Sequence, residues 1–200
     1  GWGFVRMALT SIQLEHLRGR RWRWQTPRLL SPPGEIHKNW VLFPEKIGGK
    51  YAILHSITPK IMVDYVDSLD EFDGSRFIHG SGRSGGRPEH WDKVVRGAGA
   101  PPIKTKEGWL LFYHGMDPAR AEIGYKLGVM LLDLHDPTIV RYRSAQPVLE
   151  PTEWYENDWK PGTMVATGAV VVGSDLIVYY GGGDKRIAAA RAPLRDFLRQ

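Results

Sequence analysis

The sequence predicts an all-β protein, specifically a β-propeller, from three observations. A turn followed by an alternating apolar strand with a polar end occurs three times, at residues 48–55, 107–114 and 174–184. The copies begin roughly 60 residues apart, which is enough chain for a four-stranded blade with long loops. The 23 Gly and 14 Pro in 200 residues favour short strands and turns over helices.

Alternation and turn residues predict the elements in order. Strands are expected over residues 4–12, 40–47, 51–56, 61–68, 93–97, 109–115, 125–133, 140–143, 164–172, 176–181 and 186–190. Short helical turns are expected at residues 14–20, 67–72 and 192–200. No shift in composition divides the chain, so residues 1–200 are expected to form a single domain.

A propeller usually closes with four or more blades, and this chain accounts for about three and a half. Residues 4–12 alternate like an outer strand, with no inner strand before them. We therefore expect a propeller domain that is incomplete at its N-terminus. Because an open propeller exposes blade faces and strand edges, we expect a longer polypeptide or association with another copy as a homo-oligomer.

Composition excludes several classes of protein. A net charge of +5 includes an arginine cluster at residues 18–28, which a solvated outer strand explains better than nucleic-acid binding. The absence of cysteine excludes disulfides, thiolate metal sites and a cysteine nucleophile. No apolar run suggests a membrane partner, the histidines lack metal-ligand spacing, and a cytoplasmic protein without cofactor is expected.

Two segments carry residues suited to binding. Glu45 and Lys46 follow a strand that Pro44 ends, and Lys46 is either a point charge for an anion such as phosphate or part of a surface ion pair. Residues 96–103 combine small residues with two prolines. This composition suits a close approach to a ligand or, equally, a rigid connection between blades.

The polar ends of the three repeats are His55, His114 and Asp184. A single histidine at a strand end is more often structural, but recurrence at equivalent positions favours a shared site. Tyrosines accompany His114 and Asp184, and aromatic rings beside polar groups are how proteins hold sugars. Carbohydrate is therefore the expected ligand class.

Five ordered motifs resemble glycoside hydrolase family 130: residues 38–47, 97–115, 125–137, 147–151 and 179–184. The resemblance runs from about Val5 to the C-terminus. It implies a five-bladed β-propeller and a phosphorylase of β-mannosides, which transfers mannosyl with inversion to inorganic phosphate and gives α-mannose 1-phosphate. Phosphate arrives already anionic, so the reaction needs one acid and no general base.

By this resemblance, some residues hold phosphate and others the sugar. The predicted phosphate-binding residues are Lys46, His114 and Asn39. The predicted sugar-binding residues are Tyr125, Asp184, His55 and Arg96. Inorganic phosphate is a co-substrate, and no metal is implied.

The sequence departs from the family in two places. The family's proton-donor aspartate lies in an Asp-Pro-Arg motif that nothing here matches, so this chain alone is expected to be inactive. Trp159 stands where glycine is usual, and Val165 and Ala166 where an aromatic residue is common. A β-mannoside hydrolase of the same fold and a non-catalytic carbohydrate-binding propeller remain the alternatives, although Lys46 and His114 favour phosphate.

Overall fold

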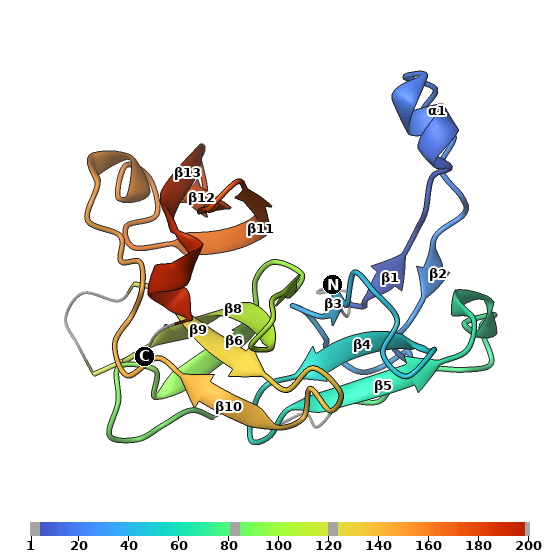
Figure 1. Cartoon of the computed structure of the whole chain (residues 1–200), viewed down its shortest axis with the longest axis horizontal. Coiled ribbons are helices and arrows are strands. Elements are labelled where there is room, and N and C mark those ends of the chain that lie inside the picture. Colours follow the sequence, from blue (N-terminus) through green and yellow to red (C-terminus); the bar gives the residue numbers. More distant parts are fainter. Residues whose placement is uncertain (1–4, 81–84, 120–123, 199–200) are drawn as a thin grey trace.

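The computed structural model of this protein describes residues 5–80, 85–119 and 124–198. Within these residues the strands form four antiparallel sheets (Figure 1). The smallest is a ribbon of β1 (Ala8–Leu9) and β2 (Arg28–Leu29). The first large sheet contains β3 (Val41–Leu42), β4 (Tyr51–Ser56) and β5 (Met62–Val66). The second contains β6 (Val94–Ala98), β7 (Ile103–Lys104), β8 (Trp109–Met116), β9 (Lys126–Leu132) and β10 (Val140–Arg143). The third contains β11 (Met164–Val172), β12 (Asp175–Gly182) and β13 (Arg186–Pro193).

The three large sheets are successive blades of a β-propeller. In the first and third sheets, strands that follow one another in the chain are neighbours. The second sheet differs only in the short β7, which pairs with one end of β8 while β6 pairs with the other end. The three sequence repeats form β4, β8 and β12, and each lies between two other strands of its sheet. The fold class predicted from the repeats is therefore confirmed.

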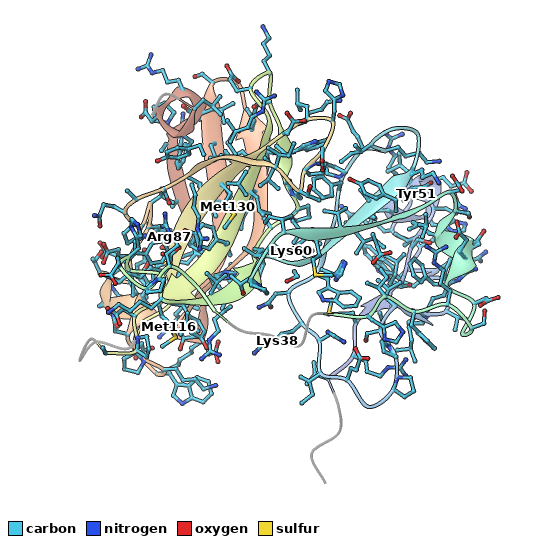
Figure 2. All side chains as sticks on the ribbon, turned by 90° about the horizontal axis from the view of Figure 1, so that it is seen from below. Lys38, Tyr51, Lys60, Arg87, Met116 and Met130 are labelled. Carbon is cyan, nitrogen blue, oxygen red and sulfur yellow. The ribbon has the colours of Figure 1, made fainter. Side chains whose placement is uncertain are left out.

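The core lies between neighbouring sheets, and β8 shows how the sequence produces it. Successive residues of a strand face opposite sides of the sheet. Leu111, which is fully buried, packs in a cluster with Leu54 of the first sheet, whereas Phe112 packs in a cluster with Val178 of the third. Met130, only 1% exposed, belongs to the same cluster as Leu111 and is labelled among the packed side chains in Figure 2.

The described residues contain four short helices, and only the one at residues 154–156 was not expected from the sequence. They are α1 (Leu14–Arg18), η1 (Leu69–Glu71), η2 (Trp154–Glu156) and η3 (Leu194–Phe197). Three match expected helical turns, although residues 199–200 of the last expectation lie outside the described residues. No helix in the described part of the chain is long and apolar enough to span a membrane.

The segment before the first blade forms an arm rather than a blade-like sheet. Phe4, the first residue of the strand expected there, lies outside the described residues, and β1 pairs with β2 alone. Figure 1 shows α1 at the end of this ribbon, away from the large sheets. At the base of the arm, Leu30 is buried against Ile53 and Phe72, so this end is anchored to the first sheet.

Candidate functional site

Three of the predicted site residues form a chain of contacts across the first and second sheets. Asn39 lies just before β3, and its side-chain Nδ2 donates a hydrogen bond of 2.5 Å to the carbonyl oxygen of Arg96 in β6. The Arg96 guanidinium lies over the ring of Tyr125, with its carbon 5.6 Å from the ring centroid. Arg96 is exposed, so its charge remains available to a ligand.

A glycine makes the contact between Asn39 and the second sheet possible. Gly97 has a φ of 124°, and a Cβ placed there would lie 2.7 Å from the Asn39 Cβ. Asn39 also has a positive φ, of 62°, which asparagine tolerates better than most residues. The small residues at 97–99 thus admit a close approach. At Gly97 the approaching group is the Asn39 side chain, not a ligand.

His114 lies inside β8, which continues to Met116, so the expectation of a polar strand tip is wrong. Its ring is 2% exposed, and Nε2 accepts a 2.8 Å hydrogen bond from the Ala166 backbone N–H. Burial lowers the pKa of His114 to about 4, and a hydrogen bond to the Gly97 backbone opposes this shift only in part. The ring is therefore neutral at pH 7, and it joins three strands instead of offering phosphate a positive charge.

Asp184 occupies the turn between β12 and β13. Gly183 and Asp184 both have positive φ, 59° and 54°, as the two central residues of a type I′ hairpin turn require. The Asp184 carboxylate accepts a 2.7 Å hydrogen bond from Lys160 Nζ. Two residues after Lys160, the Gly162 carbonyl accepts a 2.7 Å hydrogen bond from the backbone N–H of Tyr125. The segment that contacts Asp184 is thereby connected to Tyr125, the residue beneath the Arg96 guanidinium.

Lys46 follows β3 in the chain, whereas Asn39 precedes it. Six residues lie between the two. The Lys46 ammonium lies over the Tyr51 ring, 4.4 Å from its centroid, and the neighbouring Glu45 is ion-paired with Lys104. The contacts of Lys46 are therefore separate from those that link Asn39, Arg96 and Tyr125, and its predicted phosphate role stays a prediction.

A groove connects these two regions. It has a volume of about 610 Å³ and follows the chain from Trp40 to Lys46, with Gly99 and Pro101 of the second sheet and Thr167 of the third opposite. All three blades contribute to it. A ligand in this groove could contact both Lys46 and Trp40, the neighbour of Asn39 in the chain.

His55 contributes to the groove only through Trp40. Its side chain is 3% exposed, and Nε2 lies 3.2 Å from Oδ2 of Asp64. This hydrogen bond lowers the pKa of Asp64. The ring of His55 meets that of Trp40 edge-on at 5.6 Å between centroids. The structure thus places His55 behind the groove wall, where direct contact with a sugar is not available.

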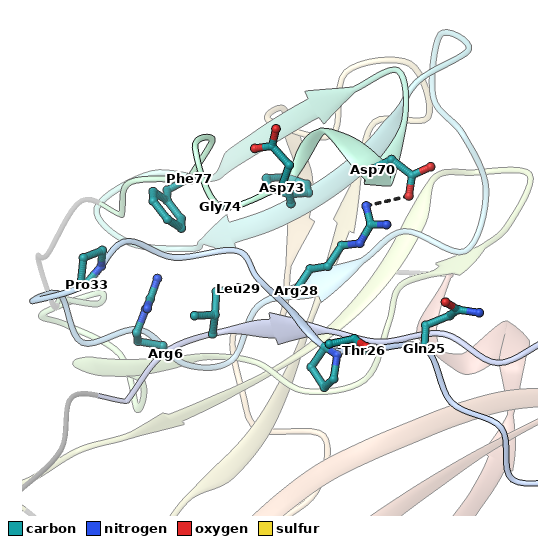
Figure 3. A pocket seen from close by; sticks show the side chains of 12 residues that line it. Arg6, Gln25, Thr26, Arg28, Leu29, Pro33, Asp70, Asp73, Gly74 and Phe77 are labelled. Carbon is teal, nitrogen blue, oxygen red and sulfur yellow. Dashed lines mark ion pairs between the residues drawn. The ribbon is translucent and has the colours of Figure 1, made fainter.

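A larger hollow of about 890 Å³ lies at the base of the arm and contains none of the predicted site residues. Arg28 and Asp70 face each other across it as an ion pair (Figure 3). Arg6 is also engaged, since its guanidinium lies 5.4 Å from the Phe77 ring centroid and donates to the Ser31 carbonyl. Because it contains none of the predicted site residues and both Arg28 and Arg6 are engaged within the protein, this hollow is a weaker candidate than the groove.

The structure also shows what sequence reasoning missed. Lys160 was not predicted, although it follows Trp159 in the segment that departs from the family pattern. Trp40, buried in the groove wall, was passed over as a strand residue. In the described ranges, no cluster of three or more His, Asp or Glu side chains is arranged to hold a metal ion.

Comparison with known proteins identifies the family of the chain. A family profile described as beta-1,4-mannooligosaccharide phosphorylase matches residues 34–199. The chain is 38% identical to a 1,2-beta-oligomannan phosphorylase from Thermoanaerobacter sp. (strain X514), over 81% of this chain and 52% of that protein. It is 39% identical to a beta-1,2-mannobiose phosphorylase from Listeria innocua, over 82% of this chain and 46% of that protein.

Solved structures give the same result. The solved complex of the beta-1,2-mannobiose phosphorylase from Listeria innocua with beta-1,2-mannobiose superposes with a TM-score of 0.70 at 36% identity, covering 88% of this chain and 50% of that one. This chain spans about half the length of the curated relatives that it matches. On the profile match and these identities, the chain belongs to glycoside hydrolase family 130.

Proposed function

We propose that this chain forms part of an inverting phosphorylase of β-mannosides. In the reaction, an oxygen of inorganic phosphate forms a bond to the anomeric carbon of a mannosyl unit while the glycosidic bond to the leaving sugar breaks. The leaving oxygen takes a proton from an acid, and the product is α-mannose 1-phosphate. The observation that carries the proposal is the exposed Arg96, whose backbone carbonyl accepts a hydrogen bond from Asn39 and whose guanidinium lies over the Tyr125 ring.

Arg96 is suited to binding phosphate for two physical reasons. A guanidinium is always charged and presents several N–H donors in a plane, which matches two phosphate oxygens. Its position is fixed, because Asn39 binds the backbone of Arg96 and the Tyr125 ring supports the side chain. We assign the predicted phosphate role to Arg96 with Asn39, while His114 positions Gly97 and Ala166 around them.

The sugar is expected beside this cation. The Tyr125 ring offers an apolar face to sugar C–H groups, and the Asp184 carboxylate, half exposed beside Lys160, offers acceptors for hydroxyls. The relatives that share 38–39% identity are named for β-1,2-linked mannosides, whereas a relative named for β-1,4-mannooligosaccharides shares 29%. We therefore propose a β-1,2-linked mannoside as the substrate.

Titration calorimetry of this chain with inorganic phosphate, alone and with mannose, tests the proposal. We expect Arg96→Ala to weaken phosphate binding by at least about tenfold, the size of one charge-assisted hydrogen-bond pair. Lys46→Ala is the matched control, since it also removes one exposed cation beside a tyrosine ring. We expect it to change the affinity less than about twofold.

The outcomes separate the alternatives. Loss of phosphate binding in Lys46→Ala but not in Arg96→Ala would move the anion site to the other end of the groove. Mannoside binding without phosphate binding would favour the hydrolase or the non-catalytic carbohydrate-binding protein. If the unaltered chain binds neither ligand, the proposed function is wrong for this chain.

A further inference from the structure

The third sheet has one packed face and one open face. Successive residues of β12 point to opposite faces. Leu176 and Val178 are at most 5% exposed and pack in the cluster shared with the second sheet, whereas Tyr179, on the other face, is 43% exposed. The register of the strands brings apolar side chains of all three onto the open face: Val170 and Val172 from β11, Ile177 and Tyr179 from β12, and Ile187 from β13.

This open face is unusually apolar. Ile187 is 92% exposed and Val172 is 58% exposed. A sheet face in contact with water normally carries polar side chains. Within β11–β13, the charged residues on this face are Asp175 and Arg191, and they pair with each other, since Arg191 Nε donates to Asp175 Oδ2 at 2.7 Å. An exposed apolar patch of this kind marks an interaction site.

The row of three large sheets is covered at one end and open at the other. On the first sheet, Ile53 of β4 faces away from the second sheet and is buried against Leu30 and Phe72. Figure 1 shows the arm and the third sheet on opposite sides of the molecule. Stacked repeats bury their apolar faces against neighbours and need a cap at each end. In the described residues the third sheet has no such cap.

A second copy of this chain is a suitable occupant of the open face. Because Asp175 and Arg191 neutralise each other, two such faces do not repel. Each copy offers one open face of this kind, since the far face of the first sheet is already covered. A contact between two identical faces is isologous and closes after two copies, so it gives a dimer and not a filament.

We propose that this chain dimerises about a two-fold axis through the open face of the third sheet, with Ile187 and Val172 buried between the copies. Three strands of eight or nine residues present roughly 400 Å² of sheet. This is about half the usual area per partner, so the dimer is weak and exchanges with monomer, with a Kd of about 10 µM. The proposal goes beyond the proposed function and does not depend on it.

Sedimentation equilibrium tests the dimer, at concentrations from about tenfold below to about tenfold above this Kd. We expect the unaltered chain to pass from monomer to dimer over this range. Ile187→Lys places an unpaired charge in the interface of both copies, so we expect it to raise the Kd at least about tenfold. Val172→Lys is a second variant on a different strand, with the same expected direction.

Ile139 provides the matched control. It is 52% exposed and lies before β10 in the second sheet, away from the open face. Ile139→Lys makes the same chemical change, and we expect it to leave the Kd unchanged. Because Ile187, Val172 and Ile139 are all exposed, none of the substitutions leaves a cavity in the core.

A fluorescent label locates the interface independently. The sequence contains no cysteine, so Ile187→Cys carries a polarity-sensitive fluorophore at one position only. We expect its emission to shift to the blue as the protein concentration rises, because dimerisation removes water from this face. The same fluorophore on Ile139→Cys should show no such shift.

The contrary results are clear. A chain that stays monomeric over the whole range overturns the proposal and leaves the open face to another occupant, such as a sheet of a different polypeptide. A dimer that persists in both Ile187→Lys and Val172→Lys, or that Ile139→Lys disrupts equally, uses another surface and also contradicts it. None of these results alters the phosphate titrations that test the proposed function.

Discussion

The two ends of the first blade's β3 strand differ in what holds them. At the Asn39 end, backbone and side-chain contacts join three sheets, and a Cβ at Gly97 would overlap with Asn39. At the Lys46 end, the chain turns back at Gly48 and Gly49, and the charged side chains form pairs at the surface. A residue that binds an anion needs an available charge on a fixed backbone. Contacts between sheets fix the backbone at the Asn39 end better than surface pairs fix it at the Lys46 end.

The largest expected effect comes from adding a methyl group at the Asn39 end. In Gly97→Ala, a residue with a positive φ would gain a Cβ only 2.7 Å from the Asn39 Cβ. We therefore expect a loss of about 3 kcal/mol in the free energy of unfolding. Gly48→Ala at the other end has a positive φ of 57° but nothing within 4 Å, and should cost only about 1 kcal/mol. Urea denaturation measures both, and equal losses would contradict the comparison.

The second effect is a pH dependence carried by His114. Its pKa is about 4 in the folded protein and about 6.5 when unfolded, so the unfolded chain binds the extra proton between these values. The stabilisation is complete above about pH 6.5 and is lost as the pH falls towards 4, with a loss of about 2 kcal/mol between pH 7 and pH 5. Denaturation of His114→Gln at both pH values checks this, because the unfolding free energy of that variant should lack this change with pH. An unchanged pH dependence would assign it to other groups.

A smaller effect is expected from the hydrogen bond of Asn39. Asn39→Gly keeps the positive φ accessible but removes the donor to the Arg96 carbonyl, and should cost about 1 kcal/mol of unfolding free energy. Phosphate affinity should fall as well, since Arg96 loses its anchor. A variant with full stability and full affinity would show that this hydrogen bond does not position Arg96.

The smallest effect is expected at the Lys46 end. Glu45→Gln removes the ion pair with Lys104, whose two side chains are about half exposed. Exposed pairs contribute little and are screened by salt, so the change should stay within about 0.5 kcal/mol and shrink further at high ionic strength. Thermal melting at low and high salt measures it, and a loss above 2 kcal/mol would show that this end is as strongly held as the other.

Sequence patterns predicted the long strands of the blades, but the strands expected over residues 4–12 and 40–47 are only the two-residue β1 and β3, and the short β2 and β7 were not predicted. The apolar residues of 109–115 identified β8 almost to its ends, because both faces of this strand are buried against neighbouring sheets. The repeat predicted that β4, β8 and β12 occupy equivalent positions, and the sheet order confirms it. These features depend on local chain chemistry, which a single sequence contains.

The relative placement of site residues could be predicted only in part. That Asn39 meets Gly97 depends on how the first and second sheets pack, and that Lys46 lies over Tyr51 depends on the position of the β3–β4 turn. His114 was expected at a strand tip because the sequence does not show that β8 continues past it to Met116. Such distances between segments are set by tertiary packing, which no local pattern encodes.

The two faces of β8 have a consequence for how the protein unfolds. Since Leu111 belongs to the core shared with the first sheet and Phe112 to the core shared with the third, loosening this one strand weakens two interfaces together. In a linear array of repeats, each unit couples only to its neighbours, and the middle unit transmits the coupling. The second blade therefore governs unfolding cooperativity: weakening β8 should split a single denaturation transition into separate steps for the outer blades.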